Sequence, residues 1–214
     1  MKYKIEKNTV QETLILPLYS RKLCTELYPN LYRDETAVRL IDQIDYDFSE
    51  AEKNSRSLMQ RFGALEVAMR QNDLAWEVRD YLKTHPGAAV FFSSGVFYYF
   101  LTEQVKALVQ QMADAFSGSV LVFDAANQTA VKMIAKTWLK SAKIKDVGAY
   151  FAVSDAPKEI GEWDNRLQVT SRGYMLGYND LRDTSVSGFF RFLARVGDNG
   201  MKMQIVKIRF GGKL

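Results

Sequence analysis

The sequence predicts a single α/β domain, because helical and strand patterns alternate along its 214 residues without a repeat, a low-complexity stretch or a linker. Two runs, AAVFFSS and SVLVFDA, are apolar enough to be buried strands, and a stretch with helical periodicity precedes each of them. Two later runs, RLQVTSRGYML and MKMQIVKIRF, alternate more regularly and predict antiparallel strands. We therefore expect helices packed on a mixed sheet.

The predicted helices have recognisable ends. A short helix in DETAVRLIDQID begins at Asp34, a good N-cap, and a long helical pattern over 56–83 shows a break near Gly63. The run His85-Pro86-Gly87 ends that pattern, because proline cannot continue the hydrogen-bond ladder. TEQVKALVQQMADAF predicts a helix capped by Thr102, and FFRFLARVGDNG fits either a short helix or one arm of a hairpin.

Composition excludes several classes of protein. No run approaches the ~20 apolar residues of a membrane helix, and the first residues lack the apolar core of a signal peptide, so we expect a cytoplasmic protein without a membrane partner. Cys24 is the only cysteine and has no neighbours at ligand spacing, so we expect a buried thiol and no metal site.

The net charge of +4 is mild, and the lysines gather in one place. Lys132, Lys136 and Lys140 recur every four residues and would line one face of a helix. A nucleic-acid-binding stripe has this pattern, but so does a solvated face opposite an apolar one. We favour the solvated face and expect no nucleic-acid partner.

Two residues could carry chemistry by their position alone. Asp124 ends the strand SVLVFDA, and open α/β sheets place ligand chemistry at the carboxyl ends of parallel strands; a loop cap or a helix-dipole partner is the equal alternative. His85 is the only histidine, and its place before Pro86 favours a helix terminus over a general base.

Longer stretches carry a resemblance to a family. The run YRDETAVRLIDQIDYDF, the segment AMRQNDLAWEVRDYLKTHPGAAV and the run FFSSGVFYYFLTEQVKALVQQMADAFSGSVLVFDAAN resemble the S-adenosylmethionine-dependent O-methyltransferases related to leucine carboxyl methyltransferase and to the tetracenomycin polyketide O-methyltransferase. The resemblance implies a Rossmann-like, three-layer class I methyltransferase fold. It also implies an N-terminal helical cap segment over 1–62, an α/β core over 63–214 and S-adenosylmethionine as the cofactor.

One part of the family pattern is missing. In the family, a glycine-rich cofactor loop and two further strands would follow HPGAAV, but here the chain passes directly from Val90 to Phe91. Consistently, none of the thirteen glycines forms a G-x-G pair, the spacing that lets a backbone approach a nucleotide. The resemblance then implies a reduced sheet in which the family's fourth, fifth, seventh and sixth strands remain side by side. Its new edge strand, AAVFFSS, is apolar and uncharged, which predicts either a homo-oligomer through that edge or a rearranged fold in which the edge is covered.

The resemblance also implies the site residues. Arg70 matches an arginine near the carboxylate of the cofactor's methionine part, and Ser94 and Gly95 lie where cofactor and acceptor would meet. Many relatives have glutamate at the position of Ser94. The residues that would bind a small-molecule acceptor are Tyr19, Arg21, Tyr98 and Tyr99, with a structural role such as core packing as the alternative for all four.

Two functions follow from these observations. The family transfers a methyl group from S-adenosylmethionine to a hydroxyl or carboxyl oxygen of a small-molecule or polyketide-like acceptor. Such enzymes work mainly by holding donor and acceptor in line. Without the cofactor loop the chain lacks the main means of fixing the donor, which counts against methyltransferase activity. The alternative is a non-catalytic, methyltransferase-like interaction protein.

Overall fold

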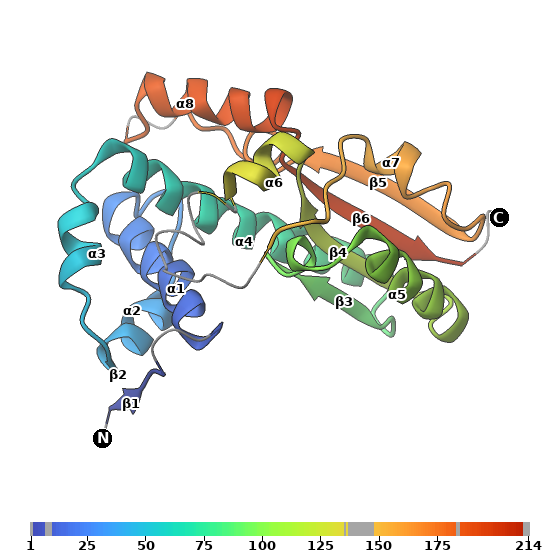
Figure 1. Ribbon diagram of the computed structural model, residues 1–214, viewed down its shortest axis with the longest axis horizontal. Helices are drawn as coiled ribbons and strands as arrows, with labels where there is room; N and C mark the ends of the chain where they lie inside the picture. The colour runs from blue at the N-terminus through green and yellow to red at the C-terminus, as the bar shows by residue number, and fades with distance from the viewer. Residues whose placement is uncertain (1, 7–9, 135, 137–147, 183–184, 212–214) are drawn as a thin grey trace.

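The computed structural model describes the whole chain except residues 1, 7–9, 135, 137–147, 183–184 and 212–214 (Figure 1). Within the described residues it is an α/β protein with eight α-helices, an open mixed four-stranded sheet and a small two-stranded sheet. Two shorter helical turns are labelled η. The elements are β1 Tyr3–Lys4, α1 Val10–Leu27, α2 Glu35–Asp42, β2 Ile44–Asp45, α3 Ser49–Asn54, α4 Leu58–Thr84, β3 Val90–Ser93, η1 Phe97–Tyr99, α5 Thr102–Ala115, β4 Val120–Ala125, α6 Gln128–Ile134, α7 Ala156–Glu159, β5 Leu167–Gly173, α8 Gly188–Arg195, η3 Val196–Gly200 and β6 Gln204–Phe210.

All four strands expected from the sequence are present in one sheet, in the order β3-β4-β6-β5. β3 is parallel to β4, whereas β6 is antiparallel to both of its neighbours, β4 and β5. The run AAVFFSS, as β3, lies at one edge of the sheet (Figure 1).

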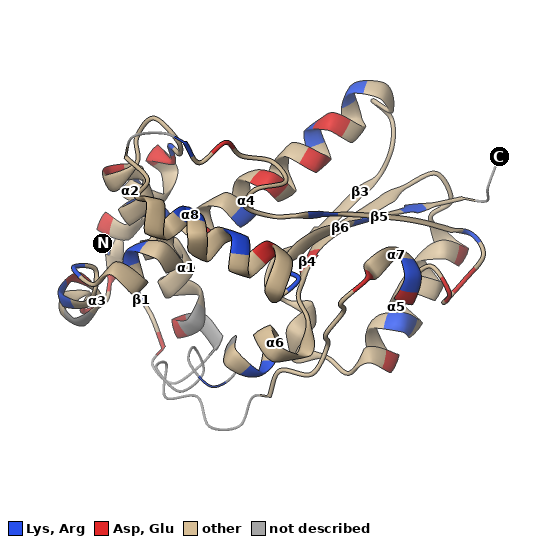
Figure 2. Ribbon diagram, turned by 90° about the horizontal axis from the view of Figure 1, so that it is seen from above, with Lys and Arg blue, Asp and Glu red and all other residues tan. Residues whose placement is uncertain are grey.

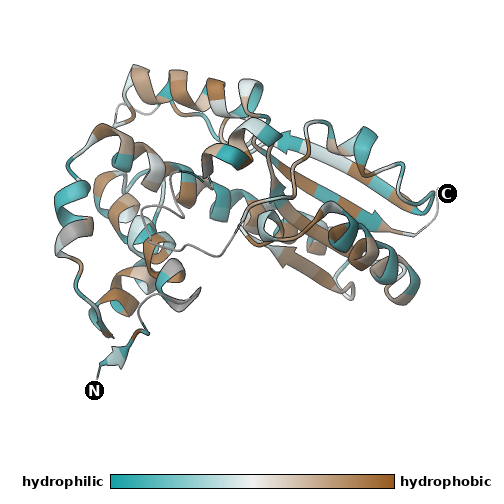
Figure 3. Cartoon of the chain, in the orientation of Figure 1, coloured by the Kyte–Doolittle hydropathy of each residue, from teal (hydrophilic) through white to brown (hydrophobic). Residues whose placement is uncertain are grey.

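Helices cover both faces of this sheet. Figure 2 shows α4 on one face and α5 and α7 on the other. Each strand packs against both layers of helices because its side chains alternate between the two faces. In β4, Val120 and Val122 pack in the cluster that contains α4, whereas Leu121 and Phe123 pack in the cluster that contains α5. β4 is buried at every residue, as its continuous apolar run predicts (Figure 3).

The N-terminal helices α1, α2 and α3 gather around the first half of α4, beyond the end of the sheet (Figure 1). α2 begins where expected, because the carboxylate of Asp34 accepts a hydrogen bond from the N–H of Ala37 at 2.9 Å. α4 then runs on to the sheet without a break, so it crosses from the cap segment 1–62 into the core 63–214. The expected break near Gly63 is wrong: this residue is helical, and an added Cβ there would meet nothing within 4 Å.

The remaining helix ends give one confirmation and one correction. α4 ends at His85, whose ring stacks on Tyr81 with the centroids 4.2 Å apart, so the terminus interpretation of His85 is confirmed. The cap of α5 is Leu101 rather than Thr102, because the Gln104 side chain reaches back to the N–H of Leu101 at 2.9 Å. The run FFRFLARVGDNG forms α8 and η3, which decides against the hairpin arm. No described helix has the length and apolar character needed to cross a membrane.

Candidate functional site

The candidate site is built around Asp124 at the carboxyl end of β4. Strand alternation turns Asp124 to the same face as Val120 and Val122, the face covered by α4. The side chain is 1% exposed, so a charge here needs partners from the protein. β3 ends beside it, and together the two strand ends form the edge at which open α/β sheets bind ligands.

Arg70 of α4 supplies the main partner. Its Nη1 donates to Oδ2 of Asp124 at 3.2 Å, and its Nε is buried with no hydrogen-bond partner among the described residues. Burial alone would lower the pKa of Arg70, but the nearby charge of Asp124, together with Tyr174, Tyr98 and Glu66, outweighs burial and the pKa is raised. The guanidinium therefore stays charged in a site almost closed to water.

Gly95 supplies the second donor from the loop after β3. Its N–H donates to Oδ1 of Asp124 at 2.6 Å, so the two carboxylate oxygens have different partners. The residue has φ +69°, and an added Cβ would lie 3.4 Å from Nη2 of Arg70, which explains why glycine suits this position. Ser94 precedes it in the bend and is partly buried.

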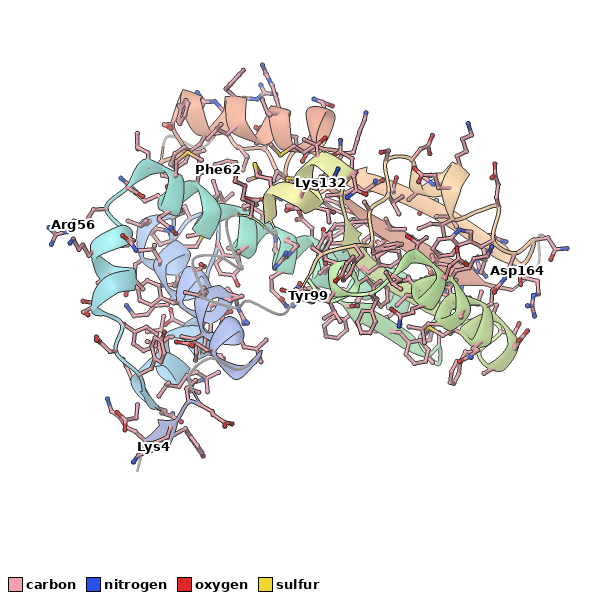
Figure 4. The ribbon with its side chains drawn as sticks, in the orientation of Figure 1. Lys4, Arg56, Phe62, Tyr99, Lys132 and Asp164 are labelled. Carbon is pink, nitrogen blue, oxygen red and sulfur yellow. The ribbon has the colours of Figure 1, made fainter. Side chains whose placement is uncertain are left out.

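Tyrosines surround this pair. Burial raises the pKa of Tyr98 well above its ordinary value, and the charge of Asp124 raises it further. Tyr174 is likewise kept neutral, by burial and by Glu66, to which its hydroxyl donates at 2.9 Å. Tyr99 is 42% exposed and lies at the end of the sheet nearest the N-terminal helices (Figure 4). The site thus offers one guanidinium, one backbone N–H and neutral phenols to an anionic group.

Glu66 was missed by sequence reasoning, although a signal was present. Its carboxyl group is buried beside Tyr174 and feels the charge of Arg70, and burial raises its pKa. Glu66 precedes Arg70 by four residues in a helical pattern, the spacing at which helix side chains meet. The i, i+4 spacing of Glu66 and Arg70 in a predicted helix therefore indicates a carboxylate beside the arginine.

The seven predicted site residues fall into two groups. Arg70, Gly95, Tyr98 and Tyr99 interact with Asp124, directly or through its charge, and Ser94 adjoins them. Tyr19 and Arg21, by contrast, have their partners in the N-terminal segment: Tyr19 stacks on Phe48 with the centroids 5.4 Å apart, and the guanidinium of Arg21 binds Asp34 at 2.8 Å.

We expect Arg21 and Asp34 to stabilise the N-terminal helices. Replacing Asp34 with alanine removes the cap of α2 and the partner of Arg21, so the free energy of unfolding should fall by about 2 kcal/mol, of which about 1 kcal/mol is the cap. Urea denaturation measures the loss. The matched control is Glu35→Ala, which removes an exposed carboxylate from the same turn and should cost under ~0.5 kcal/mol. Equal losses in the two variants would contradict this role.

A second buried polar cluster lies one and two turns further along α4. Asp73 is fully buried, with Oδ1 accepting from the side-chain amide of Asn179 at 2.9 Å and Oδ2 without a partner among the described residues. Glu77 is also buried but accepts from Lys207 at 2.6 Å and from the hydroxyl of Tyr178 at 2.7 Å. Burial raises the pKa of Asp73 to about 8, and the nearby charges of Asp198 and Glu77 act in the same direction.

Other predicted features have simple outcomes. Cys24 is buried, as expected, and burial raises the pKa of its thiol to about 12. Lys132 and Lys136 are exposed, whereas Lys140 lies outside the described residues. Among the described residues, no three His, Cys, Asp or Glu side chains are placed to hold a metal ion.

Two open cavities lie away from Arg70. One, of about 890 Å³, borders α7 and β5, and the other, of about 360 Å³, borders the end of α4. The donors at the Arg70 site can bind a carboxylate, and in this structure the carboxylate that they bind is that of Asp124. Comparisons of the chain with protein-family models, with curated proteins and with solved structures found no match.

Proposed function

We propose that this protein is an S-adenosylmethionine-dependent O-methyltransferase by descent, with a small-molecule acceptor. The observation that carries the proposal is the convergence of Arg70, Gly95 and Tyr98 on one carboxylate at the ends of β3 and β4. These are residues that the family resemblance assigns to the site. The strand order β3-β4-β6-β5, which matches the second half of a class I methyltransferase sheet, supports the same reading.

The residues present fit one half of the cofactor. The guanidinium of Arg70 and the N–H of Gly95 already hold a carboxylate, that of Asp124, and the carboxylate of a methionine moiety has the same requirements. The adenosine half lacks a comparable cradle, since the sequence has no G-x-G pair and passes directly from Val90 to Phe91.

When bound, S-adenosylmethionine supplies an electrophilic methyl group to an oxygen nucleophile. The protein's own contribution would be positional. Arg70 would anchor the donor by its carboxylate after exchanging Asp124 for it. Tyr98 and Tyr99, one buried and one half-exposed, would offer apolar area and hydroxyl groups to the acceptor.

Isothermal titration calorimetry with S-adenosylmethionine tests the proposal. We expect wild-type protein to bind, and Arg70→Lys to bind roughly tenfold more weakly, because lysine cannot form the paired hydrogen bonds of a guanidinium. Arg79→Lys, an exposed change on the same helix, should bind as wild type does. Absence of heat at millimolar ligand, both with wild-type protein and with the variant Asp124→Asn, would reject the proposal.

The second candidate is a non-catalytic, methyltransferase-like protein. It is favoured by the ion pair itself, because Asp124 satisfies the very donors that the cofactor needs. If the protein is non-catalytic, Asp124→Asn, which keeps the shape of the side chain and removes its charge, should bind no S-adenosylmethionine in calorimetry, and neither should the wild type. Binding that appears only in Asp124→Asn would instead mean that Asp124 competes with the cofactor for Arg70.

A further inference from the structure

Among the residues that the structure describes, nothing pairs with the outer side of the β3 backbone. β3 is the end strand of the order β3-β4-β6-β5, and its pairing there is with β4 (Figure 1). The N–H of Val120 bonds to the carbonyl of Ala89 at 3.2 Å. Since hydrogen-bonding groups alternate along a strand, the N–H and C=O groups of Val90 and Phe92 face outward. Such an edge is a template for another strand.

The chain segment that forms this edge is apolar and contains no charged residue. From Pro86 to Thr102 the sequence contains no Asp, Glu, Lys or Arg, although 25% of the whole chain is charged. Phe92 is 62% exposed, more than any other large apolar side chain of the four-stranded sheet. We call the following residues the edge surface: Phe92, Val96, Tyr99, Phe100, Leu101 and Phe116, all more than 40% exposed.

Proteins normally protect an edge strand with a charged side chain, a proline or a bulge. β3 has none of these over Val90–Ser93, and its register with β4 is regular. The four aromatic side chains of the edge surface together expose on the order of 400 Å², given the 150–250 Å² of each. A standard interface needs about 800 Å² from each partner, so these side chains and a paired backbone supply a large part of it.

We infer that β3 pairs antiparallel with β3 of a second copy of this chain across a two-fold axis. The lack of charge favours a second copy as the partner. A charged segment would find no opposite charge on this edge, whereas a second β3 strand is apolar and uncharged in the same way. Such an interface is isologous, so each residue meets its counterpart or a near neighbour. The inference does not depend on the proposed function.

The register follows from the faces of the sheet. A two-fold axis perpendicular to the sheet keeps the α4 face of one copy continuous with that of the other. Residues opposite each other then belong to the same face, so Phe92 meets Phe92 or Val90 of the second copy. The two four-stranded sheets become one sheet of twice the width, and the outward N–H and C=O groups of both copies are satisfied.

Sedimentation velocity over a concentration series tests the inference. Wild-type protein should sediment at twice the 24.5 kDa of one chain, and Phe92→Lys should sediment as a monomer with an unchanged circular dichroism spectrum. Phe192→Lys is the matched control, because Phe192 is 59% exposed on α8, away from the edge, and this variant should remain a dimer. A wild-type monomer at every concentration, or a dimeric Phe92→Lys, would overturn the inference.

A cross-link tests the register independently of stability. In the register that pairs Phe92 with Phe92, Phe92→Cys places the two thiols at the axis, where opposite Cα atoms about 5.5 Å apart suit a disulfide. Under mild oxidation this variant should form covalent dimers, and Phe192→Cys should not. The buried Cys24 leaves the introduced cysteine as the exposed thiol of the described chain. Equal cross-linking of both variants would show that contact is not specific to β3.

Discussion

Replacing Asp73 with asparagine is expected to stabilise the protein at alkaline pH. The pKa of Asp73 is about 8 in the folded protein, against 3.8 when the group is unperturbed, so the folded state favours the protonated acid. Stability from this group is therefore complete below pH 4 and is lost as the pH rises from about 4 to 8. Asparagine has the shape of the neutral acid and cannot ionise.

The expected size of the effect is large. A shift of about four pKa units corresponds to a difference on the order of 5 kcal/mol between acid and alkaline conditions. Urea denaturation at pH 5 and pH 8.5 measures it as a gap between Asp73→Asn and wild type that widens with pH. Asp80→Asn, on the same helix but exposed to solvent, should show no such widening. Parallel stability profiles for Asp73→Asn and wild type would contradict the prediction.

Replacing Arg70 with methionine is expected to cost about 3–5 kcal/mol of stability. The change leaves the carboxylate of Asp124 buried without a cation, with the neutral donors Gly95 and Tyr98 still beside it. Removing one partner of a buried ion pair is costly because the other charge stays out of water. The free energy of unfolding in urea is the relevant measurement.

Two further variants separate this cause from lost packing. Arg79→Met makes the same chemical change at an exposed position of α4 and should alter stability by under ~0.5 kcal/mol. The double change Arg70→Met with Asp124→Leu removes both charges and should recover part of the loss. If the double variant were as unstable as the sum of the two single ones, packing rather than charge would explain the cost.

The core of the fold could be predicted from sequence because its strands are buried. The apolar run of β4 and the alternation of β5 and β6 both follow directly from how many faces each strand covers. α1 was expected only as part of the helical cap segment 1–62 that the family resemblance implies, and it contains Pro17, a residue that normally breaks a helix. The break expected at Gly63 did not occur, because glycine costs a helix only about 1 kcal/mol and the packing of α4 outweighs that cost.

Several residues of the candidate site could be predicted from the sequence, but the ion pair between Arg70 and Asp124 could not. Position alone drew attention to Asp124, and the family resemblance drew attention to Arg70 and Gly95. The contact between Arg70 and Asp124 joins residues 54 positions apart, and only the packing of α4 on β4 brings them together. Asp73 could not be found from sequence, because its burial depends on which face of α4 meets Asn179.

The order of the sheet has a consequence for how the protein is made. β4 ends at Ala125, but its antiparallel partner β6 begins only at Gln204. On the ribosome, β4, the strand that is buried at every residue in the folded sheet, therefore emerges long before the strand that will pair with its second side. During that interval the nascent chain presents VLVFDA as an unpaired edge. We expect chaperone binding to the nascent chain to concentrate on this stretch and to end when β6 leaves the exit tunnel.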